Sequence, residues 1–253
     1  MTLNACAAIV ERSDPDRFLA TMSCPPVVRE KLFPLFAYNA EIARAPWVTG
    51  EPIIAQMRLQ WWRDAVDEAG MGKPARAHEV AAPLHGLIQQ HTGLPPLLDA
   101  MAEARLWEVQ PAPFADAAAL WAHIDAGSGN LGWACALCFA VPPEREPVVR
   151  AAALASGLAA WLMAVPALRA KGMEPLPPSV SADKLAQDGL ARLREAKREN
   201  TRDITPVLRP FWRAEALLKQ VVKTPEAVEN GALGTSEFRR RASLIYKSMR
   251  GSW

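Results

Sequence analysis

Residues 56–68 read QMRLQWWRDAVDE, and their apolar positions recur at the spacing of an α-helix rather than of a strand. On a helical wheel, the apolar side chains between residues 51 and 69 spread over one wide arc: Ile53, Ile54, Met57, Leu59, Trp61, Trp62, Ala65 and Val66. The remaining face holds Gln60, Arg63, Asp64 and Asp67. We therefore predict an amphipathic helix that opens at Glu51-Pro52 and packs its apolar arc against a core.

The same helical signal recurs along the whole chain, interrupted by turn-forming residues. Asp14-Pro15 places a capping side chain before a proline at the first helical position, which is typical of a helix start. No internal repeat and no long linker is visible, so we predict an all-α, single-domain fold over residues 1–253. The expected helices cover residues 14–23, 26–45, 51–69, 77–91, 95–109, 114–140, 145–170, 181–200, 204–222 and 235–250.

The composition argues against several classes of protein. A net charge of +2 gives no reason to expect a nucleic-acid partner. Four cysteines in 253 residues do not form a disulfide framework, and the first residues do not resemble a signal peptide, so a cytoplasmic location is expected. The uncharged residues 151–168 are borderline in length for a membrane span. Their high alanine content favours a buried core helix instead.

The three carboxylates at Asp64, Asp67 and Glu68 have two interpretations. Clustered carboxylates can hold divalent cations, so they could belong to a metal site. A solvated helix face is favoured, because Arg63 and Asp67 are spaced i, i+4 and can form an ion pair there.

Arg58 differs from these residues because it falls inside the apolar arc, one turn before the tryptophans. Its charge must either extend past them to water or meet a buried partner. The helix expected at 26–45 carries Asn39 within its own apolar arc, and the short connection at 46–51 predicts antiparallel packing with Asn39 about opposite Arg58. We predict an interior cavity in which Arg58 hydrogen-bonds to Asn39 or Glu41.

Several stretches together resemble one family of known proteins. They read DPDRFLATMSCPP from residue 14, REKLFPLFAYNAEIARAP from 29, EPIIAQMRLQWWRDAVDE from 51, WAHIDAGSGNLGWACALC from 121 and ASGLAAWLMAVPALRAKGMEPLPP from 155. The chain resembles the squalene/phytoene synthase family, best over residues 14–178. The resemblance implies the all-helical isoprenoid-synthase fold of enzymes that join two prenyl diphosphates head to head.

Activity in that family depends on two aspartate-rich motifs that hold Mg²⁺ ions, which neutralise the leaving diphosphate. The first motif should follow FAYN, but residues 40–47 read AEIARAPW and contain Glu41 as their only carboxylate. The second should lie around residues 157–170, and no Asp or Glu occurs between Pro147 and Met173. We therefore predict no catalytic residue, no metal ligand and no cofactor.

The substituted motif has relatives of its own. F-x-x-N-x-E-x-A followed by R-x-Q-W-W resembles the non-catalytic branch of the family that includes a mitochondrial respiratory complex I assembly factor, and the ending RRRASLIYKSMRGSW is similar to that branch too. We predict that the matching residues line a cavity retained from the synthase fold. They are Asn39, Glu41, Arg58, Gln60, Trp61 and Trp62.

This resemblance implies a non-catalytic protein that helps to assemble a respiratory membrane complex from its cytoplasmic side. The expected partners are subunits of that complex, with peripheral contact to the inner membrane. Two alternatives remain open. One is a working prenyltransferase with displaced acidic residues, which would use Mg²⁺. The other is a binding protein for an isoprenoid or lipid ligand.

Residues 235–253 form a basic amphipathic segment. Phe238, Ala242, Ile245, Met249 and Trp253 recur at helical spacing, with basic residues beside them. Such a helix can dock on a membrane surface or a partner, and the candidate docking residues are Arg239, Arg240, Arg241, Ile245 and Met249. The alternative is a terminal helix packed on the domain, with Ile245 and Met249 buried.

Three smaller patterns have simple interpretations. Cys135 and Cys138 form a single C-x-x-C within an apolar helix, where buried thiols are expected rather than zinc ligands. His78, His85 and His91 are too widely spaced to share an ion and are expected at the surface. Asp99 and Glu103 are spaced i, i+4 and are expected on a solvated face.

Overall fold

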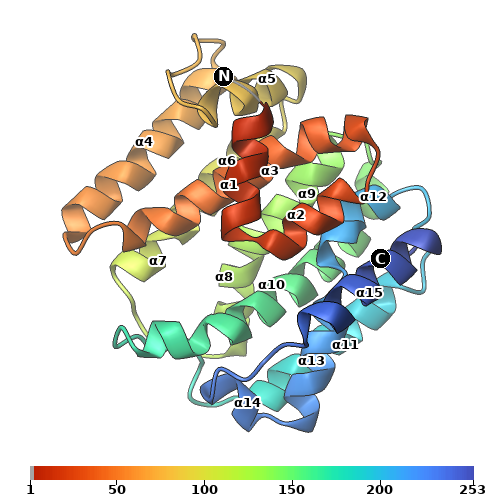
Figure 1. Ribbon diagram of the computed structural model, residues 1–253. Coiled ribbons are helices and arrows are strands. Elements are labelled where there is room, and N and C mark those ends of the chain that lie inside the picture. Colours follow the sequence, from red (N-terminus) through yellow and green to blue (C-terminus); the bar gives the residue numbers. More distant parts are fainter. Residues whose placement is uncertain (1–2) are drawn as a thin grey trace. The chain divides into compact units, whose positions relative to one another are not determined.

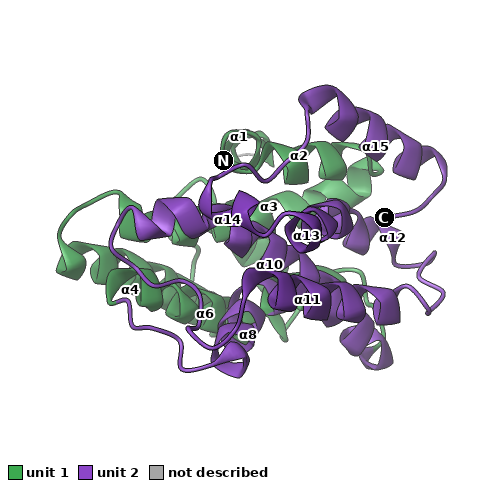
Figure 2. Ribbon diagram, turned by 90° about the horizontal axis from the view of Figure 1, so that it is seen from below, with its two compact units in different colours: residues 1–110, 130–142 green, residues 111–129, 143–253 purple. Residues whose placement is uncertain are grey.

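The computed structural model describes residues 3–253, which contain helices and their connections but no strand (Figure 1). The predicted all-α class is confirmed. Contacts divide the chain into two compact units (Figure 2). Unit 1 comprises residues 1–110 and 130–142, and unit 2 comprises residues 111–129 and 143–253.

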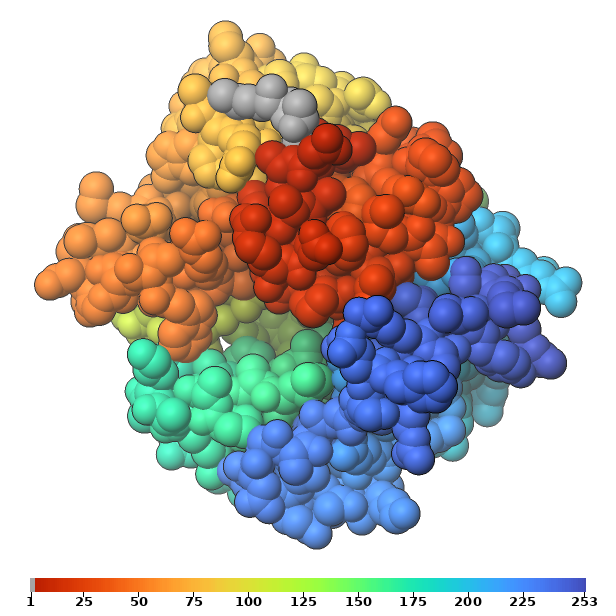
Figure 3. All heavy atoms as spheres, in the orientation of Figure 1, coloured from red at the N-terminus to blue at the C-terminus, as the bar shows by residue number. Residues whose placement is uncertain are grey.

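Unit 1 is organised around α3 (Pro26–Arg44), whose buried side chains include Leu32, Phe36 and Tyr38. Helices α1 (Leu3–Ser13), α5 (Ala81–Gln90) and α9 (Asn130–Leu137) pack on it. The other elements are α2 (Pro15–Met22), η1 (Ala45–Trp47), α4 (Pro52–Gly70), α6 (Leu94–Ala104) and α7 (Leu106–Val109). Helices α1 and α2, red in Figure 3, contribute to the surface of this unit.

The predicted helix starts in unit 1 have a visible cause. The Asp14 side chain accepts a hydrogen bond from the backbone N–H of Arg17 at 2.9 Å, and Pro15 occupies the first position of α2. Helix α3 runs from Pro26 to Arg44 with Pro34 inside it. Helix α1 is not among the elements that the sequence predicts, although it buries Cys6, Ile9 and Val10.

Unit 2 is organised around α10 (Glu146–Arg169), which packs against α11 (Ala182–Ala196), α13 (Ala214–Lys223) and the π-helical turn η2 (Asp125–Gly129). Its other elements are α8 (Ala117–Ile124), η3 (Pro143–Arg145), α12 (Thr205–Leu208), η4 (Arg209–Phe211), α14 (Glu226–Glu229) and α15 (Glu237–Met249).

Helix α10 has the burial of a core helix. By length and composition, one helical stretch of residues 3–253, Pro143–Arg169, could cross a membrane, and 56% of its most apolar window is buried in the protein. A buried helix in the core of a soluble protein has the same length and hydropathy. Leu158, Leu162 and Val165 of α10 are fully buried, as expected for the core helix inferred from sequence.

The helix predicted over residues 114–140 is divided by η2 into α8 and α9. A Cβ on Gly129 would lie 1.8 Å from Oδ1 of Asp125, so only glycine fits beside that carboxylate. Arg150 of α10 donates to the same oxygen at 2.9 Å. The wider π turn thus brings Asp125 and Arg150 together within unit 2.

Candidate functional site

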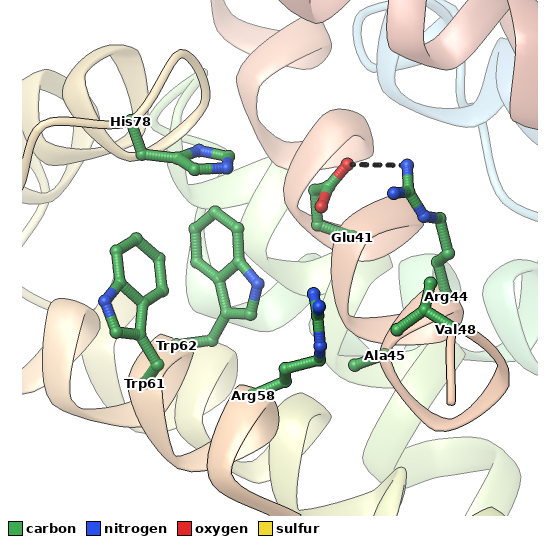
Figure 4. A pocket seen from close by; sticks show the side chains of 8 residues that line it. All are labelled: Glu41, Arg44, Ala45, Val48, Arg58, Trp61, Trp62 and His78. Atoms are coloured by element: carbon green, nitrogen blue, oxygen red, sulfur yellow. Dashed lines mark ion pairs between the residues drawn. The ribbon is translucent and has the colours of Figure 1, made fainter. Parts of the chain in front are cut away.

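A pocket of about 200 Å³ opens in unit 1 between the C-terminal end of α3 and the middle of α4 (Figure 4). Its walls are aromatic on one side and charged on the other. The lining residues are Glu41, Arg44, Ala45, Val48, Arg58, Trp61, Trp62 and His78. Four of the six predicted cavity residues therefore line one pocket: Glu41, Arg58, Trp61 and Trp62.

The aromatic wall is a cluster of perpendicular rings. Trp62 is buried, and its ring centroid lies 4.9 Å from Trp61, 5.0 Å from His78 and 5.5 Å from Tyr38, each in an edge-on arrangement. Tyr38 is fully buried and donates its hydroxyl to the carbonyl of Leu98 at 2.6 Å, which ties α3 to α6. Burial in this apolar surrounding raises the pKa of Tyr38, so the phenol keeps its proton. The Tyr38 hydrogen bond and these ring contacts hold Trp62 in the pocket wall.

His78 belongs to the irregular segment between α4 and α5, and Arg76 holds that segment in place. The Arg76 guanidinium donates to both carboxylate oxygens of Glu68, at 2.7 and 3.0 Å, and to the carbonyl of Trp61 at 3.0 Å. It also lies 5.2 Å from the centroid of the Trp61 ring. These hydrogen bonds from Arg76 lower the pKa of Glu68. Arg76 thereby positions His78 over the tryptophans (Figure 4).

The tautomer of neutral His78 follows from one contact. The backbone N–H of Val80 donates to Nδ1 of His78 at 3.1 Å. Because Nδ1 accepts, Nε2 carries the proton in the neutral ring. His78 can therefore offer an N–H donor to a molecule in the pocket.

The charged side of the pocket contains one acid and two arginines. Glu41 lies 3.9 Å from Arg44, a pair that Figure 4 marks with a dashed line. Arg58 extends between Trp62 and Glu41 in the same view. It is exposed and forms no hydrogen bond or ion pair with any residue that the structure describes. The pocket thus holds one arginine whose charge is not neutralised by the protein.

The prediction that Arg58 lies in the interior, hydrogen-bonded to Asn39 or Glu41, is wrong. It assumed that α3 and α4 pack side by side along their length, but α4 packs mainly against α6 and α5. Arg58 instead extends past the tryptophans to water, the alternative that the sequence left open. Asn39 lines a different pocket beside α1 and α2. Gln60 is exposed, donates a hydrogen bond to Asp64 at 2.7 Å, and lines neither of these two pockets.

Acids of α4 and α6 form ion pairs with two arginines, Arg63 and Arg76. Arg63 pairs with Asp99 at 2.7 Å and with Glu103 at 3.9 Å, rather than with Asp67 as predicted. Arg76 forms an ion pair with Glu68 at 2.7 Å, and Asp64 lies 3.6 Å from the same guanidinium. Within residues 3–253, no group of three or more His, Cys, Asp or Glu side chains could hold a metal ion.

The C-x-x-C pair is buried, as predicted. Burial raises the pKa of both thiols, to about 12 for Cys138, so neither supplies a thiolate near neutral pH. Lys31 of α3 donates to the carbonyl of Cys138 at 2.6 Å, which fixes the end of α9 on α3. Both side chains pack in the core of unit 1.

The pocket also includes residues that the sequence did not assign to the cavity. His78 was expected at the surface, but it is half-buried against Trp61 and Trp62. Arg44 and Val48 lie at the end of α3 and just after η1. No periodic signal marks these positions, since two of the three belong to irregular connections.

The squalene/phytoene synthase family model matches residues 10–235 of the chain. The chain belongs to this family. A crystal structure of a dehydrosqualene synthase in complex with ligand superposes with a TM-score of 0.79 at 11% identity, covering 99% of this chain and 97% of the other. Squalene synthase HpnC from Alicyclobacillus acidocaldarius gives 0.63 at 12% identity, covering 98% and 94%. These structures confirm the predicted isoprenoid-synthase-like fold.

Curated relatives of this family member match shorter stretches. A complex I assembly factor 6 homolog from Drosophila melanogaster is 39% identical over 66 residues, which is 25% of this chain and 19% of that protein. Complex I assembly factor 6 from Homo sapiens is 27% identical over 86 residues, covering 34% and 26%. The chain thus matches about a quarter or less of the length of these relatives.

The residues present do not fit the Mg²⁺ ions of a squalene/phytoene synthase. Mg²⁺ takes oxygen ligands and is usually held by one or two carboxylates together with the phosphates of the substrate. Within residues 40–47 the only carboxylate is Glu41, which lies 3.9 Å from Arg44, and residues 147–173 contain no Asp or Glu.

Proposed function

We propose that this protein is a non-catalytic squalene/phytoene synthase family member that takes part in the assembly of a respiratory complex I. The similarity to named complex I assembly factors supports the role, and the whole-chain likeness to solved synthases supports the inherited scaffold. Its partners are then subunits or assembly intermediates of that membrane complex.

The observation that carries the non-catalytic part is the replacement of the first acidic motif. Glu41 is the only carboxylate in residues 40–47, and Arg44, one turn later, lies 3.9 Å from it. An arginine at that distance opposes the binding of a divalent cation to the same carboxylate. The remaining pocket can bind a molecule, but it lacks the means to ionise a diphosphate.

The assembly role is tested by removing the gene and measuring NADH-dependent quinone reduction in isolated membranes. Succinate-dependent quinone reduction in the same membranes is the internal control. We expect the NADH-dependent rate to fall, the succinate-dependent rate to stay unchanged, and the wild-type chain to restore the loss. An unchanged NADH-dependent rate would overturn the assembly role.

The competing function, a working prenyltransferase, predicts a different result in vitro. The purified protein, mixed with Mg²⁺ and farnesyl or geranylgeranyl diphosphate, should release no diphosphate above a blank. Steady release that disappears in Asp64→Asn or Asp67→Asn protein would show that displaced acids do the chemistry. That outcome would contradict the non-catalytic proposal without affecting the fold.

A second candidate function is ligand binding, favoured by the unpaired Arg58 beside an aromatic wall. A cation, the Nε2–H of His78 and two indole rings suit a small ligand with an anionic head and an apolar body. The pocket volume of about 200 Å³ limits the ligand to a small molecule, and a five-carbon prenyl phosphate is a suitable probe. Tryptophan fluorescence should report its binding.

The matched variants for this test are Arg58→Gln and Arg44→Gln. Loss of the charge-assisted contact in Arg58→Gln should weaken binding by about tenfold. Arg44→Gln should weaken it less, because Arg44 already shares its charge with Glu41. Equal binding by wild type and Arg58→Gln, or no binding of the prenyl phosphate, would remove this candidate.

A further inference from the structure

Helix α15 presents an apolar stripe to solvent. Phe238 is 81% exposed, Ile245 59% and Met249 83%, and Ala242 between them is exposed too. These four positions, which we call the α15 stripe, fall on one side of the helix. Contact between water and large apolar side chains is unfavourable, so a continuous exposed row of them indicates a surface that another phase or molecule covers.

The opposite side of α15 is fastened to unit 2. Leu244 is buried, and Lys247 donates to the carbonyl of Trp212 at 3.0 Å. Beyond the helix, Gly251 adopts a φ of 61° and Trp253 donates its indole N–H to Thr201 at 2.9 Å. The left-handed glycine closes the helix, and the Ser252 N–H bonds to the carbonyl of Lys247 at 2.9 Å. The exposure of the stripe is therefore a fixed feature of the helix.

Basic side chains border the stripe on both sides. On a helical wheel, Arg241 lies on one side and Arg239 and Arg250 on the other, and all three are exposed. The only acid in α15 is Glu237, paired with Arg241 at 2.5 Å. Arg240, which the sequence placed among the docking residues, is half-buried on the face of α15 that packs on unit 2. The charge next to the stripe is thus positive.

We infer that α15 docks the protein on an anionic lipid membrane, with the α15 stripe inserted among the acyl chains and Arg239, Arg241 and Arg250 at the phosphate groups. The charge pattern matches a lipid surface that is negative at its face and apolar beneath. The stripe is the outer, convex side of a helix, which fits a bilayer directly, whereas a protein partner would need a complementary groove. This docking is independent of the proposed assembly role.

The inference is tested with the full chain and lipid vesicles. The protein should sediment with phosphatidylcholine vesicles that contain phosphatidylglycerol and should not sediment with vesicles of phosphatidylcholine alone. Binding should weaken as salt is added, because the attraction is screened. The triple variant Arg239→Gln, Arg241→Gln, Arg250→Gln should bind at least about tenfold more weakly, since each basic residue near the surface adds to the affinity. Ile245→Ser with Met249→Ser should also reduce binding.

Two control variants separate docking by α15 from other causes. Arg194→Gln, Arg198→Gln, Arg202→Gln removes three exposed arginines from another part of unit 2 and should bind like wild type. Ile53→Ser with Met57→Ser removes the two most exposed apolar side chains of α4, which are 61% and 66% exposed, and should also bind like wild type. Because all these side chains are exposed, the variants should fold normally.

Three results would overturn the inference. The first is the absence of sedimentation with anionic vesicles. The second is an equal loss of binding in the two arginine triple variants, which would reduce the effect to overall charge. The third is a loss of vesicle binding in the α4 variant while the α15 variants bind like wild type.

Discussion

Arg63 of α4 donates two parallel hydrogen bonds to Asp99 of α6, from Nε at 2.7 Å and from Nη2 at 3.0 Å. The hydrogen bonds to Asp99 are the main reason that the pKa of Arg63 is raised. The pair joins the helix that carries the pocket tryptophans to the helix that receives the Tyr38 hydroxyl. It therefore helps to fix the position of α4.

Replacing Arg63 should weaken this junction. The side chains are 26% and 40% exposed, so we expect Arg63→Met to lower the free energy of unfolding by only about 1 kcal/mol. Asp99→Asn should cost a similar amount, and the double variant should cost less than the sum. Urea unfolding of the four proteins measures the coupling.

Arg58 supplies the control for Arg63 on the same helix. It is exposed and has no ion-pair partner among residues 3–253. Arg58→Met should therefore leave the free energy of unfolding within about 0.5 kcal/mol of wild type. If both variants lost equal stability, the Arg63 effect would be a general cost of removing an arginine from α4.

The sequence predicted the helices better than the direction in which their side chains point. The pattern over residues 51–69 predicted the bounds of α4 within one residue, because helical periodicity depends on local spacing. The wheel placed Ile53, Ile54 and Met57 with the buried arc, yet all three are exposed. Burial depends on what lies opposite: α4 packs mainly against α6 and α5, and only Ala55, Leu59, Trp62, Val66 and Ala69 are buried.

The candidate site shows the same limit. Motif residues on α3 and α4 could be named from the sequence, since they share a family pattern. His78 could not, because Arg76 and Val80 place its ring through contacts that carry no sequence signal. The predicted contact between Asn39 and Arg58 required side-by-side packing, which the loose contact between α3 and α4 does not provide.

Gly157 of α10 should resist substitution. A Cβ there would lie 2.5 Å from the Ser128 side chain and 2.7 Å from Ile124, so α10 approaches α8 and η2 only because the residue is glycine. We expect Gly157→Ala to lower the free energy of unfolding by about 1 to 3 kcal/mol through overpacking. Thermal and urea unfolding measure the change.

Gly86 of α5 provides the matched control. It is also a helical glycine, but a Cβ added to it would meet no atom of a neighbouring group within 4 Å. Gly86→Ala should raise the free energy of unfolding by up to about 1 kcal/mol, since alanine favours the helix. A stabilising effect at both positions would show that α10 can move away from η2 at little cost.

Tyr38→Phe should destabilise the protein although it removes a single oxygen. The change leaves the buried carbonyl of Leu98 without its hydrogen bond, which should cost about 1 to 2 kcal/mol. Tyr246→Phe should cost nothing measurable, because Tyr246 is 56% exposed. Equal effects in urea unfolding would mean that the Leu98 carbonyl finds another donor.

Lys247 gives α15 a pH-dependent attachment. Burial, followed by repulsion from Lys197, lowers its pKa to about 8, while its amine donates to the Trp212 carbonyl. Repulsion from Arg209 and Lys219 adds to the shift, and Glu215 opposes it. Between about pH 8 and the ordinary lysine value of about 10.4, the folded state therefore binds fewer protons than the unfolded state.

The free energy of unfolding should accordingly rise with pH over that window, because stability increases wherever the unfolded state holds more protons. We expect the rise to reach about 1 to 3 kcal/mol in wild type and to disappear in Lys247→Met, as measured by urea unfolding from about pH 7 to about pH 10. Lys223→Met, at an exposed lysine of α13, should keep the rise. If Lys247→Met and wild type followed the same pH profile, Lys247 would be charged in the folded protein throughout, and the fastening of α15 would not depend on pH.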